Sequence, residues 1–585
     1  MGRMAHLVLA AVLAMAAAAA MVSASPAEGI QPLSKIAIHK ATVELHGSAY
    51  VRATPTLLGD QGEGTEWVTV KYGRENPSSD DWIAVFSPAD FISGSCPNPR
   101  RNADEPGLCT APIKYQYANY SANYRYWGKG TIRFQIINQR SDFSFALFTG
   151  GFENPKLVAV SKPVAFKNPK APVFPRLAQG KTHDEMTVTW TSGYDIDEAY
   201  PLVEWGMVTP GGGVRNPTRT PAGTLTFNRG SMCGMYSYKI GHELSDGTMV
   251  WGKSYTFRAP PTPGQNSLQR IIVFGDMGKA ERDGSNEFAN YQPGSLNTMD
   301  TLVKDLDNYD IVFHIGDMPY ANGYLSQWDQ FTAQVVPISA RKPYMVASGN
   351  HERDWPNTGG FFDVKDSGGE YKVDYGMFRF CVADTGHDWR EGTPQHKFIE
   401  ECLSTVDRKH QAWLIFAAHR VLGYSSNAWY AAEGSFEEPE GRESLQKLWQ
   451  RYRVDMAFFG HVHNYERTCL LYQSQCVTGE RSHYSGTMNG TIFVVAGGSG
   501  SHLSSYTTAI PRWSVFRDQD YGFVKLTAFN HSSLLFEYKK SSDSNVYDSF
   551  TIDRDYRDVL SCVHDSCFPT TLALSPSSGP SWQRC

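Results

Sequence analysis

The sequence predicts a multidomain protein in which N-terminal β-sandwich units precede an α/β domain built from βαβ units. The chain has 585 residues, more than a single hydrophobic core usually accommodates. Up to residue 259, short stretches of alternating apolar and polar residues are separated by Gly, Pro, Asn and Asp, which is typical of sandwich strands. After residue 267, apolar runs alternate with helical patterns, which indicates βαβ units around a buried sheet.

The N-terminus is typical of a signal peptide over residues 1–24. Arg3 and His6 precede an apolar run at residues 7–22, and the small residues Ser23 and Ala24 suit cleavage. The run is short and dominated by Ala, which favours a signal peptide over a membrane anchor. We therefore expect a secreted protein with no membrane association once the peptide is removed.

Two β units are expected after the signal peptide. The first spans residues 25–168, with alternating stretches at 67–72 and 131–137. A Pro-rich segment at 169–175 opens the second, which spans residues 169–262. Strand candidates in this second unit lie at residues 186–191, 202–205 and 236–240.

The third domain is expected over residues 268–555, and an irregular tail containing Cys, Ser and Pro over residues 556–585. Helical spacing of apolar residues separates several of its strands, as at 296–306 and 445–452. Its strand candidates lie at residues 270–274, 310–315, 344–347, 413–417, 455–459 and 491–495.

The composition is that of an ordinary globular protein. Charged residues make up 19%, hydrophobic residues 41%, and the net charge is -6. These values exclude a disordered chain, and no block of charge indicates a polyanion partner such as a nucleic-acid duplex.

An exported chain enters an oxidising compartment, so its ten cysteines are disulfide candidates rather than metal ligands. The short-range pairs we expect are Cys96 with Cys109, Cys469 with Cys476, and Cys562 with Cys567. The partners of four others remain open: Cys233, Cys381, Cys402 and Cys585. Sequons suited to a glycoprotein occur at Asn119, Asn489 and Asn530.

Five of the six strand candidates of the third domain run directly into polar clusters. These clusters are Gly275-Asp276-Met277-Gly278, Gly316-Asp317-Met318-Pro319-Tyr320, Gly349-Asn350-His351-Glu352, His419, and Gly460-His461-Val462-His463. Ligands of open α/β sheets bind outside the carboxyl ends of the strands, so all five clusters can converge on one crevice. A single Gly-Asp is commonly a turn, but five clusters in this order predict a metal site.

The types of donor indicate which metals the site would hold. Carboxylate, imidazole, amide and phenolate groups without cysteine favour Fe, Mn or Zn. The free pKa of tyrosine is about 10, so Tyr320 needs a strong Lewis acid to lose its proton. It therefore points to a trivalent ion, Fe(III), the alternative being a buried core tyrosine.

These motifs resemble those of the purple acid phosphatases, within the metallophosphoesterase superfamily. The resemblance implies a metallophosphoesterase domain of two packed mixed sheets, and a fibronectin type III-like domain at residues 169–262. All seven metal-ligand positions of the family are filled. By resemblance, Asp276, Tyr320 and His463 would bind Fe(III), Asn350, His419 and His461 would bind a divalent Zn, Mn or Fe, and Asp317 would bridge the two.

The resemblance also implies a mechanism and a location. A hydroxide generated at the metals would attack phosphorus, and His351 would either donate to the phosphoryl or leaving-group oxygen or orient a ligand. Glu352 is expected to be structural. The segments at 320–328 and 419–426 resemble the plant branch associated with nucleotide pyrophosphatase/phosphodiesterase activity, which implies export to the cell wall, apoplast or vacuole.

The sequence departs from the family pattern at two places. Phosphomonoesterases of the family carry histidine nine or ten residues after the equivalent of His419, where this chain has Ala428 and Trp429. Loss of a general acid matters least for good leaving groups, so the substrate shifts towards anhydrides, activated diesters or aryl esters. Trp429 and Tyr430 would either stack on a nucleobase or pack the loop. Related plant chains also carry an aromatic-rich segment that this chain lacks after Glu370.

The leading hypothesis is a secreted dinuclear-metal acid phosphatase or phosphodiesterase that acts on small phosphorylated substrates, with nucleotide pyrophosphates or diesters favoured. A broad phosphomonoesterase that also accepts inositol phosphates is the first alternative. The second is a weakly active or inactive secreted glycoprotein that binds partners through its β units. The sequence leaves the oligomeric state open.

Overall fold

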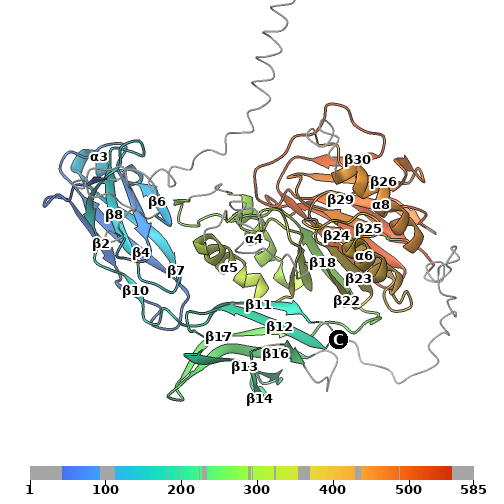
Figure 1. Cartoon of the computed structure of the whole chain (residues 1–585), viewed down its shortest axis with the longest axis horizontal. Coiled ribbons are helices and arrows are strands. Elements are labelled where there is room, and N and C mark those ends of the chain that lie inside the picture. The colour runs from blue at the N-terminus through green and yellow to red at the C-terminus, as the bar shows by residue number, and fades with distance from the viewer. Residues whose placement is uncertain are drawn as a thin grey trace, which may run out of the picture.

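A computed structural model gives the fold of the chain (Figure 1). It describes residues 42–91, 112–180, 184–195, 197–222, 224–226, 234–287, 294–321, 325–352, 369–427, 437–486 and 488–555, together with residues 182 and 292. The predicted signal peptide, the predicted tail, and the cysteine pairs expected at 96 with 109 and at 562 with 567 lie outside these residues.

The first β unit is a sandwich whose two sheets meet in a core that includes Val68, Ile83, Phe134 and Phe145. One sheet has three strands, β2 (Tyr50–Thr54), β4 (Thr65–Gly73) and β7 (Lys129–Ile137). The other has six, in the order β1 (Thr42–Val43), β9 (Lys156–Val160), β8 (Ser144–Thr149), β5 (Trp82–Phe86), β6 (Lys114–Tyr117) and β19 (Asn286–Glu287). Its minor elements are β3 (Leu57–Leu58), β10 (Ala165–Phe166), η1 (Ala118–Tyr120) and α3 (Tyr124–Trp127).

The second β unit also has two sheets, which enclose Leu177, Val188, Val203 and Tyr238. Three strands form one sheet: β11 (Val173–Gln179), β12 (Glu185–Thr191) and β15 (Thr224–Thr226). Four antiparallel strands form the other, in the order β14 (Val214–Pro221), β13 (Ala199–Val208), β16 (Met235–Leu244) and β17 (Met249–Arg258).

The α/β domain contains two mixed sheets that pack face to face. Parallel and antiparallel strands form a seven-stranded sheet in the order β21 (Tyr344–Val346), β20 (Ile311–His314), β18 (Gln269–Phe274), β31 (Gly522–Ala528), β32 (Ser533–Lys540), β33 (Val546–Asp553) and β28 (His483–Ser485). The eight strands of the second sheet are β22 (Tyr371–Tyr375), β23 (Phe378–Ala383), β24 (Trp413–Ala418), β25 (Met456–Phe459), β29 (Thr491–Ala496), β26 (Tyr465–Tyr472) and β27 (Gln475–Cys476), with β30 (Ser514–Asp518) paired to β26.

Helices cover the outer face of each sheet, which gives a helix-sheet-sheet-helix arrangement. Side chains from both sheets, such as Val273 and Ile415, fill the central core. On the first sheet lie α4 (Gly294–Lys304) and α5 (Leu325–Ser339), with η2 (Leu306–Asn308) after α4. On the second lie α6 (Pro394–Ser404) and α8 (Glu437–Tyr452). The predicted fold class is confirmed, and all six predicted strands form, each end within one residue of its expected position.

Two disulfides lie in the described part of the chain. Cys469 pairs with Cys476, as expected, and joins β26 to β27. Cys381 pairs with Cys402, which the sequence had left open, and ties β23 to α6. Within the described ranges, none of the helices has the length and apolar character needed to cross a bilayer.

Candidate metal centre

The predicted donors lie on loops that follow the carboxyl ends of strands in both sheets of the α/β domain. Several of these loops turn sharply, because Asp276, Asp317, Tyr320 and His461 all adopt the left-handed backbone conformation. Non-glycine residues rarely adopt this conformation, and strain of this kind is concentrated at functional sites. This backbone geometry is the first structural indication that these loops form a functional site.

A glycine precedes four of the seven donors and allows the loops to approach one another. A Cβ atom on Gly460 would lie 2.6 Å from Oδ2 of Asp276, and one on Gly316 would collide with the ring of His419. The Gly-Asp and Gly-His pairs of the sequence therefore have a physical reason: the first residue makes room for a donor that comes from another strand.

One group of donors consists of Asp276, Tyr320 and His463. The phenol oxygen of Tyr320 lies 3.1 Å from Oδ1 of Asp276 and 3.0 Å from Nε2 of His463. The same His463 nitrogen lies 3.2 Å from Oδ1 of Asp276. Three donor atoms of different chemistry thus converge on one point.

A second group of donors consists of Asp317, Asn350, His419 and His461. Nε2 of His419 lies 3.1 Å from Oδ1 of Asn350 and 3.2 Å from Oδ2 of Asp317. One donor atom from each of Asp317, His419 and His461 lies within 4.8 Å of the other two. Asp317 also belongs to the first group with Asp276 and His463, so it connects the two groups.

Hydrogen bonds behind the donors orient them. Nδ1 of His419 donates to the carbonyl of Ile315 at 2.9 Å, and Nδ1 of His463 donates to the carbonyl of His502 at 2.7 Å. In each ring Nδ1 therefore carries a proton, and Nε2 is the nitrogen that faces the other donors and that a cation would bind in place of a proton.

Glu352 fixes the backbone around Asp317. Its carboxylate accepts hydrogen bonds from the N–H groups of Asp317 at 2.8 Å, Met318 at 2.8 Å and Gly349 at 2.7 Å. It therefore joins the loop after β20 to the loop after β21, in line with the structural role expected for it.

The charges of the two donor groups favour the binding of cations. Burial opposes ionisation of Asp317, but His419 lowers the pKa of Asp317 overall. Against the effect of burial, Asp317 and Asp276 raise the pKa of His419 to about 10. Burial, reinforced by Asp276, raises the pKa of Tyr320 well above its usual value. Two fully buried carboxylates surrounded by oriented imidazoles and a phenol fit a pair of bound metal ions.

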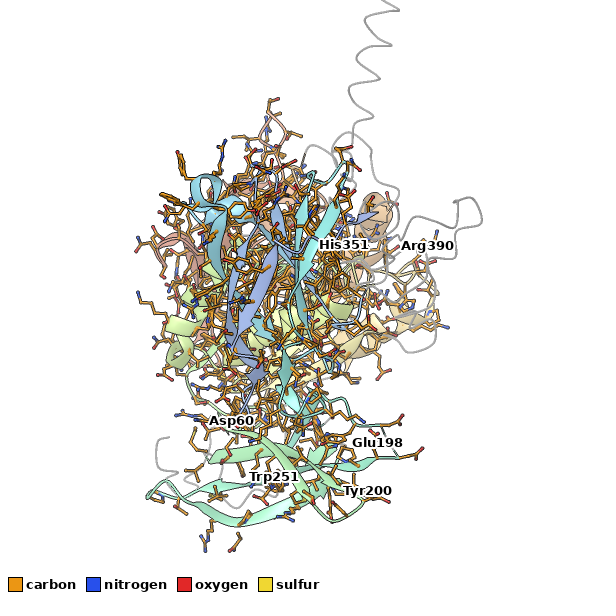
Figure 2. The ribbon with its side chains drawn as sticks, turned by 90° about the vertical axis from the view of Figure 1, so that its left-hand side faces the viewer. Asp60, Glu198, Tyr200, Trp251, His351 and Arg390 are labelled. Carbon is orange, nitrogen blue, oxygen red and sulfur yellow. A yellow bond between two sulfur atoms is a disulfide. The ribbon has the colours of Figure 1, made fainter. Side chains whose placement is uncertain are left out.

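His351 lies beside the donors but is not one of them. Its ring centre is 4.5 Å from that of Tyr320, and its backbone N–H donates to Oδ1 of Asp317 at 2.9 Å. The side chain is half-buried. In Figure 2, His351 lies far from Tyr200 and Trp251, so these parts of β13 and β17 in the second β unit are remote from the centre.

One residue near the donors was missed in the sequence. His502 packs its ring against that of His463, with 4.5 Å between ring centres, and its side chain is exposed. It follows β29, the one predicted strand for which no polar cluster had been identified. The run Gly497-Gly498-Ser499-Gly500-Ser501-His502 after that strand is the signal that could have revealed it.

The remaining predicted residues belong to the loop after His419, to the segment before Glu370 and to the glycosylation sites. Ala428, Trp429 and Tyr430 lie outside the described residues, as does most of the segment between Glu352 and Glu370. Of the predicted glycosylation sites, Asn119 and Asn489 are exposed and Asn530 is half-buried.

The fold and these two donor groups define a metallophosphoesterase domain, and family models agree. The model described as Calcineurin-like phosphoesterase matches residues 269–465, and Iron/zinc purple acid phosphatase-like protein C matches residues 490–549. The model described as Fn3-like domain from Purple Acid Phosphatase matches residues 51–168. This last match lies on the first β unit, whereas the resemblance had placed the fibronectin-type domain over residues 169–262.

The chain belongs to the purple acid phosphatase family. It is 60% identical to "Probable inactive purple acid phosphatase 27" of Arabidopsis thaliana, over 93% of this chain and 96% of that one. It is 84% identical to "Nucleotide pyrophosphatase/phosphodiesterase" of Hordeum vulgare, over 56% of this chain and 95% of that one. The solved structure of purple acid phosphatase PPD1 from yellow lupin seeds matches with 56% identity and a TM-score of 0.81, over 91% of this chain and 100% of that one.

Proposed function

We propose that the chain is a secreted hydrolase of phosphate anhydrides and diesters, with nucleotide pyrophosphates the favoured substrates. The observation that carries this proposal is the pair of donor groups joined by Asp317. Asp276, Tyr320 and His463 would hold Fe(III), and Asn350, His419 and His461 would hold divalent Zn, Mn or Fe. Asp317 would bridge them.

When bound, the two ions supply Lewis-acid activation of water and of the phosphoryl oxygens. The chain itself supplies orientation. The carbonyls of Ile315 and His502 hold two imidazoles in the required tautomer, and Glu352 holds the bridging residue. His351, half-buried beside Tyr320, is positioned to donate a hydrogen bond to the phosphoryl or leaving-group oxygen.

The substrate class follows from the leaving group. Ala428 and Trp429 replace the histidines that protonate the leaving group in family phosphomonoesterases. A phosphate leaving group needs little protonation, whereas an alkoxide needs much. The name of the barley relative, which is 84% identical, supports the same substrate class.

A second candidate function is a secreted glycoprotein with little or no turnover. The names of Arabidopsis relatives at 60% and 59% identity, both described as probably inactive, favour it. Against it, all seven donor positions are filled here, and donor atoms of Asp317, His419 and His461 lie within 4.8 Å of one another, as do those of Asp276, Asp317 and His463.

A substrate panel on the purified, metal-loaded chain tests the proposal. We expect faster hydrolysis of a dinucleotide pyrophosphate than of a nucleoside monophosphate at mildly acidic pH. Asp317→Ala should lower turnover by roughly 100-fold or more, because even outer-shell partners of metal ligands contribute 10- to 100-fold. Asp307→Ala, which changes an exposed acid in η2, is the matched control and should behave as the unmodified chain.

Each alternative predicts a different result. Preferred hydrolysis of the monophosphate or of inositol phosphates would favour the broad phosphomonoesterase. A chain that takes up neither iron nor a divalent metal, and stays colourless, would favour the binding glycoprotein. Equal turnover by Asp317→Ala would contradict the two-metal mechanism.

A further inference from the structure

The loop that carries Asp276 reaches from the α/β domain to the first β unit. It leaves β18 at Gly275 and has no helix or strand until β19. There it pairs with β6 of the first unit, Asn286 opposite Tyr115 and Glu287 opposite Lys114. A predicted metal ligand therefore lies at one end of a loop whose other end belongs to a different domain.

A buried lysine of the first unit forms ion pairs with two acidic residues of this loop. Nζ of Lys114 donates to Oε2 of Glu281 at 2.8 Å, to Oδ2 of Asp283 at 2.8 Å and to the carbonyl of Gln135 at 2.6 Å. The Lys114 side chain is only 3% exposed, and those of Glu281 and Asp283 are 4% and 0% exposed. All three protons of the ammonium group therefore have acceptors.

Neighbouring groups of the first unit complete the contact. The Gln135 N–H donates to Oδ2 of Asp283 at 2.7 Å, and Nε2 of Gln116 donates to the Asp283 carbonyl at 3.2 Å. Burial opposes the charges, but Glu281 and Asp283 raise the pKa of Lys114, and Lys114 lowers that of Asp283. Lys114 and Asp283 thus form a charged, hydrogen-bonded pair, and removing one partner of such a buried pair is strongly destabilising.

The middle of the loop is held indirectly by the same unit. The side chain of Gln334 on α5 accepts from Ala280 N at 3.1 Å and donates to the Gly278 carbonyl at 3.3 Å. Five residues earlier on α5, Asp329 forms a bidentate pair with Arg140 of the first unit, at 2.8 and 2.6 Å. Figure 1 shows β6 and β7 on the side of the first unit that faces α4 and α5.

We propose that Lys114 is a positioning residue for the metal ligand Asp276, so that the first β unit takes part in retaining the metal. Asp276 adopts the left-handed conformation, and the loop that follows it has no helix or strand before β19. Locally, the N–H of His461 donates to Oδ2 of Asp276 at 2.7 Å. The anchor at Glu281 and Asp283 holds the far end of the loop from the other domain and adds to this local restraint. This inference rests on the proposed metal centre.

Lys114→Met in the full chain tests the inference. We expect a chelator to remove the coloured ion, held by Asp276, Tyr320 and His463, about 10-fold faster than from the unmodified chain, at the lower end of the range for outer-shell partners. The ion held by Asn350, His419 and His461 should leave at a nearly unchanged rate. A purely structural role would release both ions equally, so the ratio of the two rates is the decisive readout.

Two further variants serve as a control and as an independent test of the same contact. Lys156→Met removes an exposed ion pair with Glu44 in the same unit and should leave both release rates unchanged. Gln116→Ala weakens the contact at Asp283 without removing a charge, and should give a smaller acceleration with the same selectivity.

The outcomes separate this inference from the proposed function. A folded Lys114→Met or Gln116→Ala chain with unmodified release rates would overturn the inference alone, as would equal acceleration in Lys156→Met. Should Lys114→Met fail to fold, the Gln116→Ala result decides. Absence of metal from the unmodified chain would overturn the proposed centre and this inference with it.

Discussion

Tyr320 is the donor that most clearly distinguishes the proposed centre from an ordinary divalent site. Its phenol lies 3.1 Å from Asp276 and 3.0 Å from His463, and it is 2% exposed. Burial and the nearby carboxylate raise its pKa far above the usual value, so ionisation requires a strongly polarising cation at this point.

We therefore expect Tyr320→Phe to abolish the visible absorption of the metal-loaded chain and to lower its iron content. The change removes one oxygen and leaves the ring packing intact, so the fold should be retained. Absorption spectra and metal analysis check this. Tyr309→Phe is the control, because Tyr309 is equally buried but donates to the carbonyl of Leu302 at 3.0 Å, away from the donors. Colour that survives in Tyr320→Phe would show that the tyrosine is not a ligand.

At the residue scale, the sequence motifs predicted more of the candidate site than the fold class alone would have predicted. Each proposed donor was predicted because it lies in a polar cluster after an apolar strand and carries a chemically suitable side chain. The resemblance to the family implied that Asp317 is shared by both groups, but the residues alone could not show it, since it depends on distances between loops of different sheets. His502 was missed because a Gly/Ser-rich run resembles a simple turn, although it ends in an imidazole.

Among the elements, the ends of β25 and β33 are joined by a buried ion pair that connects the two sheets. Asp455 precedes β25 and accepts from Nη1 of Arg554, which follows β33, at 2.6 Å. Arg554 also donates to the carbonyl of Ala412 at 2.9 Å and lies over the ring of Trp413. Asp455 lies at the start of β25, whereas His461 follows the end of the same strand. The pair therefore joins the two sheets at the end of β25 that is opposite to the donor loops.

Asp455→Asn should lower the free energy of unfolding of the α/β domain by about 3–5 kcal/mol at pH 7, the usual cost of breaking a buried pair. Burial opposes ionisation, but Arg554 and Arg408 lower the pKa of Asp455 below its usual value. The stabilisation is therefore present above the unfolded pKa of about 3.9 and is lost as the pH falls through the lower folded value. The difference between the two chains should narrow below about pH 4.

Urea titrations at pH 7 and pH 3 measure this difference. Asp307→Asn serves as the control, since Asp307 is exposed and should contribute little at either pH. A gap between Asp455→Asn and the unmodified chain that stayed constant with pH would show that the carboxylate charge is not the source of the stabilisation.

Elements whose own sequence marks them were predictable, and those that depend on distant partners were not. The six predicted strands are continuous apolar runs buried between a sheet and helices, which explains their clear signal. By contrast, β19 has two residues and exists only because β6, far earlier in the chain, lies beside it. The pairing of Cys381 with Cys402 likewise depends on how α6 packs against β23.

At the scale of the whole molecule, each proposed ion would have ligands from both sheets. Asp276, Asp317, Tyr320 and Asn350 come from loops of the sheet that contains β18, β20 and β21. His419, His461 and His463 come from loops after β24 and β25 in the other sheet. The metals would therefore join the two layers at one edge, while the first β unit, through Lys114 and Arg140, braces the loop and the helix on the outside.

Removal of the metals should consequently lower the stability of the entire α/β domain. Ions that bind only the folded chain contribute about 2.7 kcal/mol at 100 times their Kd and about 4.1 kcal/mol at 1,000 times. For a domain of this size each kcal/mol shifts Tm by roughly 2–4 °C, so chelation should lower Tm by about 5–15 °C. Calorimetry with and without chelator measures the shift. Asp317→Ala, which lacks the shared ligand, should start from the lower Tm and respond little to the chelator. A chelator that strips the metals from the unmodified chain yet leaves its Tm unchanged would mean that the two sheets hold together at this edge without them.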